Sequence, residues 1–421
     1  MFSKHINRRN FLKQGFGFVT AGVVLPHLGL SGFAQTPSFA PSDRRILVVI
    51  EFAGGNDGLN TVIPYTDPAY LKARPTIGLT DKDGILSISD RYALHPELAE
   101  LKPFYDAGNL AIVQSVGYPE ATLSHFRSRD IWHTADPVKI SGEGWLGKAA
   151  EQLYGSNVGL KALSVGNGLP KTLQSPVAVV PAIVKFPRYD YQTDSRYAAD
   201  GKNQEKTFTN IYGQTRTKGT LDQSIAMIGL DALEGADTLQ AGIAQYQSNV
   251  QYPANNPLSE GLKMLAQIIT TIPESQILYV TLGGFDNHSQ QIAAADQKLS
   301  GDHATLLKYF SEGVDAFYKD LAGHGLAEQV VVMQWSEFGR RPNENGSLGT
   351  DHGTASSLFV IGNPVKGGIY GNHPNLTSLD RAGNVTFDID FRSVYGTILD
   401  GWLKVSSSQV LGATFENIGF F

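Results

Sequence analysis

Short apolar runs alternate with amphipathic stretches along most of this chain. The runs are typical of strands buried in a parallel sheet and lie at 45–52, 110–116, 162–165, 277–282, 330–332 and 358–361. Between them, apolar residues recur at helical spacing at 97–107, 222–249, 258–271, 303–321 and 391–402. This alternation predicts an α/β fold in which a doubly wound, mostly parallel sheet carries helices on both faces.

The segment 329–362 departs from this pattern between two apolar runs. Its first run ends in Ser336-Glu337-Phe338-Gly339-Arg340-Arg341, and Asp351-His352-Gly353 precedes the second. Open α/β sheets place their ligand sites at such strand ends. Small turn residues would suffice to connect two strands, so we interpret these charged residues as part of a functional site.

Three predicted strands end in glycines or polar residues that are followed by metal-ligating residue types. The metal-ligand candidates are Asp57, Asp286, His288, Glu337, Asp351 and His352. Because the carboxyl ends of parallel strands share one edge of a sheet, these residues can converge although they are distant in sequence. The chain has no cysteine, so oxygen and imidazole would have to hold the ion. The pattern predicts a divalent metal ion (Zn, Mn or Ca) in one or two sites.

Two further residues are candidates for handling a substrate. A helix is expected within 119–134, opening near Thr122 or Ser124. Ser124 would then meet oriented backbone N–H groups, which favour an anion, and beside a metal it could act as a nucleophile; capping the helix is the alternative role. Arg340 could clamp an anionic group with two hydrogen bonds. The alternatives for Arg340 are a salt bridge to Glu337 or solvent exposure.

The N-terminal residues indicate export. Asn7-Arg8-Arg9-Asn10-Phe11-Leu12-Lys13 precedes a glycine-rich apolar stretch at 15–30, and Gly32-Phe33-Ala34 offers small residues for cleavage. This is the pattern of a twin-arginine signal peptide, here 1–34. We therefore expect a periplasmic or extracellular protein with one domain over 35–421 and no transmembrane segment in the mature chain.

Charge and local composition narrow the possible partners. The net charge of −6 does not favour nucleic acid as a partner. The stretch at about 185–218 is polar and rich in tyrosine. It is interpreted as a loop excursion, either a lid that faces a substrate or an exposed loop.

Several motifs are similar to those of one bacterial family. They are the twin-arginine signal, Phe52–Tyr65, Ser124–Trp132, Gly144–Gly147, Gly283–His288, Ser336–Arg340 and Thr350–Gly353. On these motifs the chain resembles, across essentially its whole length, the exported proteins of unknown function called DUF1501. That family in turn resembles a divergent branch of the alkaline phosphatase and sulfatase superfamily. The resemblance implies an alkaline phosphatase-like fold with a metal site at the carboxyl edge of the sheet.

The superfamily pattern implies particular roles for several residues. Glu51 or Asp57 would supply the carboxylate after the first strand, and Ser124 the hydroxyl nucleophile at a helix N-terminus. Asp286 and His288 match the Asp and His after a middle strand, with a shorter spacing than usual.

The late Asp-His pair of the superfamily matches this sequence in two ways. Asp351-His352 has the familiar residues, whereas Glu337 and Phe338 directly follow the predicted strand at 330–332. We favour the second alignment because the superfamily pair directly follows its strand. It places Phe338 where a second metal would need an imidazole, which favours one metal position.

Two functions follow from the resemblance. The first is an exported metal-dependent hydrolase of phosphate or sulfate esters, whose substrate would be a small anionic ester or a glycan. The alternative is a non-catalytic cell-envelope protein that keeps the fold and binds a glycan or a protein partner. Phe338 and the tyrosine-rich stretch favour this alternative.

Overall fold

The computed structural model describes residues 44–139, 142–166, 168–184, 198–217 and 220–421. The predicted signal peptide at 1–34 lies outside these residues. The chain divides into two compact units. The smaller unit includes 142–247 and 267–275, and the larger includes 38–141, 248–266 and 276–421. The expectation of one domain over 35–421 stays a prediction.

The larger unit is built on a sheet whose strands run in the order β13-β5-β12-β9-β1-β8. Their bounds are β1 Ile46–Ala53, β5 Leu110–Gly117, β8 Ile277–Gly283, β9 Val330–Ser336, β12 Ser356–Ile361 and β13 Gly368–Tyr370. β1 is parallel to β8 and β9, and β13 is parallel to β5. The short β14 (Ile389–Asp390) also runs parallel to β5. The predicted mostly parallel sheet is thus confirmed.

β12 is the exception, because it is antiparallel to both β5 and β9. The connection from β9 to β12 contains no helix and instead forms an antiparallel pair, β10 (Arg340–Glu344) and β11 (Thr350–His352). A parallel return needs a longer crossover, usually a helix, so this connection brings the chain back in the opposite direction. The segment 337–355 is therefore free to form a site above the strand ends.

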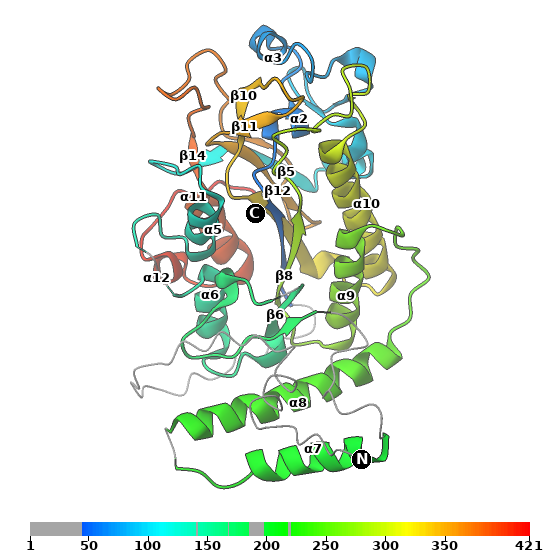
Figure 1. Ribbon diagram of the computed structural model, residues 1–421, viewed down its shortest axis with the longest axis vertical. Coiled ribbons are helices and arrows are strands. Elements are labelled where there is room, and N and C mark those ends of the chain that lie inside the picture. The colour runs from blue at the N-terminus through cyan, green and yellow to red at the C-terminus, as the bar shows by residue number, and fades with distance from the viewer. Residues whose placement is uncertain (1–43, 140–141, 167, 185–197, 218–219) are drawn as a thin grey trace, which may run out of the picture. The chain divides into compact units, whose positions relative to one another are not determined.

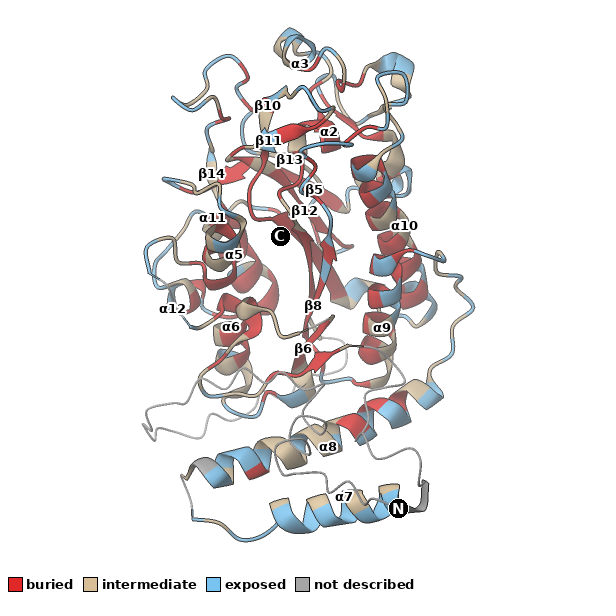
Figure 2. Cartoon of the chain, in the orientation of Figure 1, coloured by how far each residue is buried: buried red, intermediate tan, exposed pale blue. Residues whose placement is uncertain are grey.

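Helices cover both faces of this sheet. Figure 1 shows α10 (Asp302–Gly323) on one side of the strands and α5 (His125–Thr134) with α11 (Phe391–Thr397) on the other. Seven of the eight residues of β1 are buried, as its continuous apolar pattern requires. Figure 2 shows buried residues on the sides of α10 and α11 that face the strands. The predicted α/β class is confirmed.

Short elements complete the larger unit. They are α2 (Gly58–Thr61), α3 (Pro68–Ala73), a 3₁₀ turn at Asp81–Asp83, a 3₁₀ stretch at Pro96–Leu101, α4 (Lys102–Asp106), a 3₁₀ turn at Ala327–Gln329, a π-helical turn at Ile398–Leu403 and α12 (Ser407–Leu411). A small antiparallel sheet joins β2 (Val62–Ile63), β4 (Ala93–Leu94) and β3 (Leu86–Ser87). The helix α9 (Pro257–Thr271) contributes residues to both units.

The smaller unit is mainly helical. It contains α6 (Trp145–Tyr154), a 3₁₀ turn at Gly159–Lys161, β6 (Ala162–Val165), a 3₁₀ turn at Lys171–Leu173, β7 (Ala182–Ile183), α7 (Ala198–Tyr212) and α8 (Leu221–Gln245). β6 and β7 pair in parallel. Among the described helices, none combines the length and the apolar character that crossing a membrane requires.

The loop predicted at 185–218 is only partly a loop. Residues 185–197 and 218–219 lie outside the described part, but 198–212 forms α7. Phe208 and Tyr212 stack on one face of this helix with 4.1 Å between ring centroids. A Cβ placed on Gly229 of α8 would lie 2.8 Å from the Tyr212 ring. This close packing against α8, which a local polar composition does not reveal, explains the helix.

Candidate metal centre

The turn after β1 creates the floor of the site. Gly54 and Gly55 have positive φ angles, 126° and 78°, and both turn their N–H groups toward the end of β9. Gly54 N lies 2.9 Å from Glu337 Oε1 and Gly55 N lies 3.2 Å from Glu337 Oε2. A Cβ on Gly54 would lie 2.4 Å from the backbone N of Asp286. Glycine is therefore required where three strand ends meet.

The end of β8 places Asp286 beside this turn. Phe285 stacks on Phe52 of β1 at 4.2 Å between ring centroids and donates its backbone N–H to Ala53. Asp286 follows directly, half-exposed at the carboxyl edge of the sheet. The apolar stack anchors the chain so that the next residue must face the strand ends.

Three imidazoles converge on one oxygen of Asp286. The Nε2 atoms of His125, His288 and His352 lie 3.4, 3.2 and 3.2 Å from Asp286 Oδ1. His125 begins α5, His288 follows β8, and His352 ends β11. The ligand atoms of His125, Asp286 and His352 lie within 4.8 Å of one another, and His288 Nε2 lies 2.9 Å from His352 Nε2.

The other ring nitrogen of each histidine has an oxygen partner. His125 Nδ1 lies 2.9 Å from Glu337 Oε1, and His288 Nδ1 lies 3.2 Å from Asp351 Oδ1. His352 Nδ1 lies 2.8 Å from the carbonyl oxygen of Leu123. A carbonyl or carboxylate oxygen accepts, so each Nδ1 carries the proton and each neutral ring presents the Nε2 lone pair to the centre. Metal-ligating histidines have this arrangement of outer partners.

The electrostatics of the centre favour a positive charge between the imidazole rings and Asp286. Burial raises the pKa of Asp286, but the Arg340 guanidinium and the His352 ring beside it outweigh this effect and lower the pKa to about 2. The hydrogen bond to Glu337 raises the pKa of His125, whereas burial lowers that of His352. His125 Nε2 is buried and has no hydrogen-bond partner in the described part of the chain. A carboxylate facing imidazole lone pairs repels them unless a proton or a cation lies between.

His125, Asp286 and His352 form a group that could hold a zinc-type ion, with His288 beside it. Ligands at about 2.0–2.1 Å around a tetrahedral Zn²⁺ lie about 3.3 Å apart, and the three Nε2–Oδ1 distances are 3.4, 3.2 and 3.2 Å. Three imidazoles and one carboxylate suit zinc better than calcium, which prefers six or more oxygen ligands.

Phe338 forms the wall behind the imidazoles. It is buried, with its ring centroid 4.8 Å from that of His125 and 4.7 Å from that of His352. The apolar ring keeps water from the back of both histidines and offers no ligand atom. Among the described residues, one group of three candidate ligands, His125, Asp286 and His352, has its ligand atoms within 4.8 Å of one another.

Glu337 and Asp351, two of the predicted ligands, lie outside the ring of Nε2 atoms. Each instead orients a histidine: Glu337 is buried beneath His125, and Asp351 is exposed beside His288. The structure therefore brings Asp286, His288 and His352 together and places Glu337 and Asp351 behind the histidines.

Asp57 does not join the centre. Its two carboxylate oxygens accept hydrogen bonds from Arg74 at 2.6 and 2.9 Å, and Gln291 donates to Oδ2. Asp57 and Arg74 are both buried. The two-point pairing with a guanidinium explains why this carboxylate turns away from the strand ends.

Arg340 is likewise not placed as a clamp for a substrate. The side chain is buried. Its Nε donates to Gly55 O at 2.7 Å, Nη1 to Thr350 O at 2.8 Å, and Nη2 to Phe285 O at 2.9 Å. Nη2 also lies 2.8 Å from Asp286 Oδ1. Arg340 thus holds Asp286 and the surrounding loops, and its ion-pair partner is Asp286 rather than Glu337.

Ser124 occupies the N-cap position of α5, as predicted, but its side chain makes no capping hydrogen bond. It is exposed and lies in sequence between Leu123, whose carbonyl holds His352, and His125. The Ser124 hydroxyl therefore does not cap α5.

His125 is a candidate ligand that was not predicted from the sequence. It belongs to the Ser124–Trp132 motif, in which the preceding Ser124 is the residue predicted to be functional. The available signal was a histidine in the first turn of a helix that begins at the carboxyl edge of the predicted sheet.

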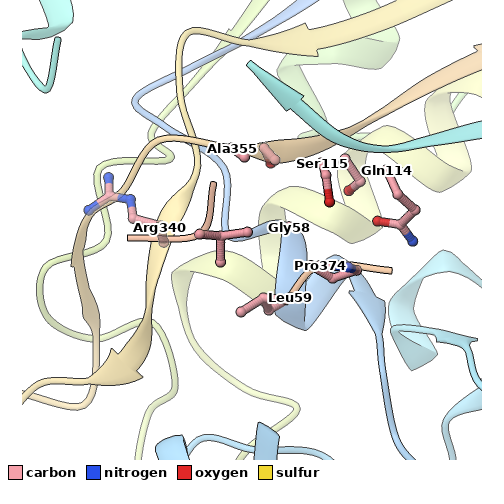
Figure 3. A pocket seen from close by; sticks show the side chains of 10 residues that line it. Gly58, Leu59, Gln114, Ser115, Arg340, Ala355 and Pro374 are labelled. Atoms are coloured by element: carbon pink, nitrogen blue, oxygen red, sulfur yellow. The ribbon is translucent and has the colours of Figure 1, made fainter. Parts of the chain in front are cut away.

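A small pocket lies beside the centre (Figure 3). It is about 300 Å³ including its open mouth, and its lining includes Gly58, Gln114, Ser115 and Ser357. None of the four ligand residues lines it, and Figure 3 shows the guanidinium of Arg340 pointing away from it. Gln114 Nε2 and Ser357 Oγ are buried without partners in the described structure. Such a polar recess suits ordered water.

Comparison with known proteins shows a family without an assigned activity. The family model described as "Protein of unknown function (DUF1501)" matches residues 44–388. None of the curated protein sequences matches the chain.

Solved structures show only a distant likeness. The C-terminal periplasmic domain of EcEptC from Escherichia coli in complex with Zn matches with a TM-score of 0.35 and 10% identity, over 76% of this chain and 74% of that one. Ps i-CgsB in complex with k-i-k-neocarrahexaose has a TM-score of 0.35 and 11% identity, over 89% and 73%. Alkaline phosphatase from the Antarctic bacterium TAB5 has a TM-score of 0.29 and 11% identity, over 78% and 95%. Structural similarity this low supports no inference about the activity or the metal of this chain.

Proposed function

This chain belongs to the DUF1501 family, and we propose that it is an exported, metal-dependent hydrolase of phosphate or sulfate esters. The observation that carries the proposal is the convergence of three imidazole Nε2 atoms on Asp286 Oδ1 at 3.2–3.4 Å. The twin-arginine sequence at 1–34 supports export. The proposed cofactor is one divalent ion, with zinc favoured by the nitrogen-rich ligand set.

Each residue of the centre has a definite task in this proposal. His125, Asp286, His288 and His352 would hold the ion, which would polarise an ester oxygen and activate a nucleophile. Glu337 and the Leu123 carbonyl keep the Nδ1 protons of His125 and His352 in place. Phe338 excludes water from behind the rings.

Ser124 is the candidate nucleophile. Its oxygen would form a bond to the phosphorus or sulfur of the ester while the bond to the alcohol oxygen breaks, and the alcohol leaves with a proton. Water would then release the phosphate or sulfate from Ser124. The first backbone N–H groups of a helix lack intrahelical partners, so the N-terminus of α5 would favour the charge that develops there.

Elemental analysis combined with an ester screen tests the proposal. We expect about one zinc per chain in purified protein and hydrolysis of at least one phosphate or sulfate ester. The variants H125A, D286A and H352A should lose both metal and turnover. The control D90N changes an exposed carboxylate elsewhere and should keep both. Wild-type protein that takes up no divalent ion would overturn the proposal.

The second candidate is a non-catalytic envelope protein that binds a glycan. Phe126 favours it, because this residue follows His125 and its side chain is 91% exposed. An exposed aromatic ring beside a metal centre can stack on a sugar ring. Metal uptake and glycan binding without ester hydrolysis would select this candidate over the hydrolase.

A further inference from the structure

A second arginine lies on the same helix as His125. Arg129 follows His125 by four residues in α5, so both side chains project from one face of the helix. Side chains of a helix lean toward its N-terminus, and here the N-terminus carries His125. This general lean would carry the Arg129 side chain toward the end of α5 at which the metal centre lies.

A buried carboxylate holds this arginine at one nitrogen. Arg129 Nε lies 2.6 Å from Glu51 Oε1. Glu51 is fully buried within β1, and its Oε2 accepts hydrogen bonds from Tyr279 at 2.7 Å and Thr281 at 3.2 Å. The hydrogen bond to this fixed carboxylate restricts the rotation of the Arg129 side chain before any ligand binds.

The two terminal nitrogens of the Arg129 guanidinium are available to bind a ligand. Across the described residues, neither Nη1 nor Nη2 of Arg129 has a hydrogen-bond partner, and its side chain is 39% exposed. The two terminal nitrogens present donors in one plane, which match two oxygens of a tetrahedral anion. Arg340, in contrast, is buried and bonded at all three nitrogens.

We propose that Arg129 binds the non-bridging oxygens of the phosphate or sulfate group of the substrate, and that Glu51 is its positioning residue. The inference rests on the proposed function for the identity of the ester. It assigns the anion-binding role to an arginine that the sequence did not single out. The anion would then lie between the metal centre at the start of α5 and a guanidinium one helical turn away.

Binding of inorganic phosphate and sulfate, measured by calorimetry, tests the assignment. Protein loaded with zinc and protein treated with EDTA are both titrated, so that binding to Arg129 is separated from binding to the metal. R129Q should weaken phosphate or sulfate binding at least about tenfold in both samples and leave the zinc content unchanged. R91Q, which changes an exposed arginine on another loop, should behave as wild type. R129K keeps the charge without the planar fork and should bind with intermediate affinity.

The positioning role of Glu51 is tested with a double-mutant cycle. E51Q should weaken phosphate binding without changing the zinc content, and E51Q/R129Q should bind no more weakly than R129Q alone. Equal affinities of wild type and R129Q for both anions would overturn the assignment. Failure of the wild-type protein to take up zinc would instead count against the proposed hydrolase. The EDTA-treated samples would still show whether Arg129 binds phosphate or sulfate.

Discussion

Glu337 Oε1 lies 2.9 Å from His125 Nδ1, which joins the first residue after β9 to the first residue of α5. The carboxylate is buried and is held in place by the N–H groups of Gly54 and Gly55. It therefore determines that Nε2 of His125, and not Nδ1, faces Asp286. A buried carboxylate thus orients a candidate ligand.

Replacing Glu337 with Gln should weaken zinc binding. The amide keeps the size of the side chain but removes the charge that fixes the Nδ1 proton, and losing such an outer partner typically costs about 10–100-fold in affinity. Competition with a chromophoric chelator measures the change. E328Q, which alters a carboxylate before β9, is the control, and equal affinities of E337Q and wild type would contradict the role given to Glu337.

Replacing Gly55 with Ala should destabilise the protein and disturb the centre. A Cβ at this position would lie 2.3 Å from Phe338 Cε2, and displacing the ring costs about 1–3 kcal/mol beyond the backbone strain. G84A is a matched control, because Gly84 has a similar φ of 75° with nothing within 4 Å of the added Cβ. Urea unfolding should show a larger loss for G55A than for G84A. Equal losses of unfolding free energy in G55A and G84A would show that the Phe338 ring can be displaced without a loss of stability.

The R74M variant should unfold more readily than the wild type and keep the same metal content. The change leaves the Asp57 carboxylate buried and unpaired, which typically costs about 3–5 kcal/mol. Thermal unfolding and elemental analysis are measured on the same sample. Loss of zinc from folded R74M protein would mean that Asp57 contributes to the centre after all.

Stability should fall in acid partly because of Glu51. Burial raises the pKa of Glu51, but hydrogen bonds and charges of His133 and Arg129 outweigh this and lower it from 4.5 to about 2. A lowered pKa means that the folded state binds this proton less readily. The contribution is complete above about pH 4.5 and disappears as the pH falls toward 2.

Comparison of wild type with E51Q isolates this contribution. The difference in unfolding free energy should be largest near neutral pH and shrink by about 3 kcal/mol between pH 5 and pH 2. Urea unfolding at several pH values measures it. A difference that stays constant over this range would show that Glu51 has the same pKa in the folded and unfolded states.

The order of strands and helices could be predicted from local patterns. Runs such as 277–282 and 330–332 are apolar on both faces, and parallel strands covered on both sides require this pattern. The position of Glu337 and Phe338 directly after β9 was also predictable, because the strand had to end where polar residues begin. The polar stretch around α7 was not, since its helix packs through contacts distant in sequence.

The sequence by itself determined that metal-ligating residue types stand at several strand ends and that the chain offers no thiol ligand. Only the tertiary structure decided which atoms meet. It brought His125 to Asp286, paired Asp57 with Arg74 and buried Arg340. Within the described residues it also left two nitrogens of Arg129 without a hydrogen-bond partner. The physical reason is that a polar side chain is fixed by its nearest partner. That partner is often hundreds of residues away, as Glu337 is from Gly54, so no local pattern records it.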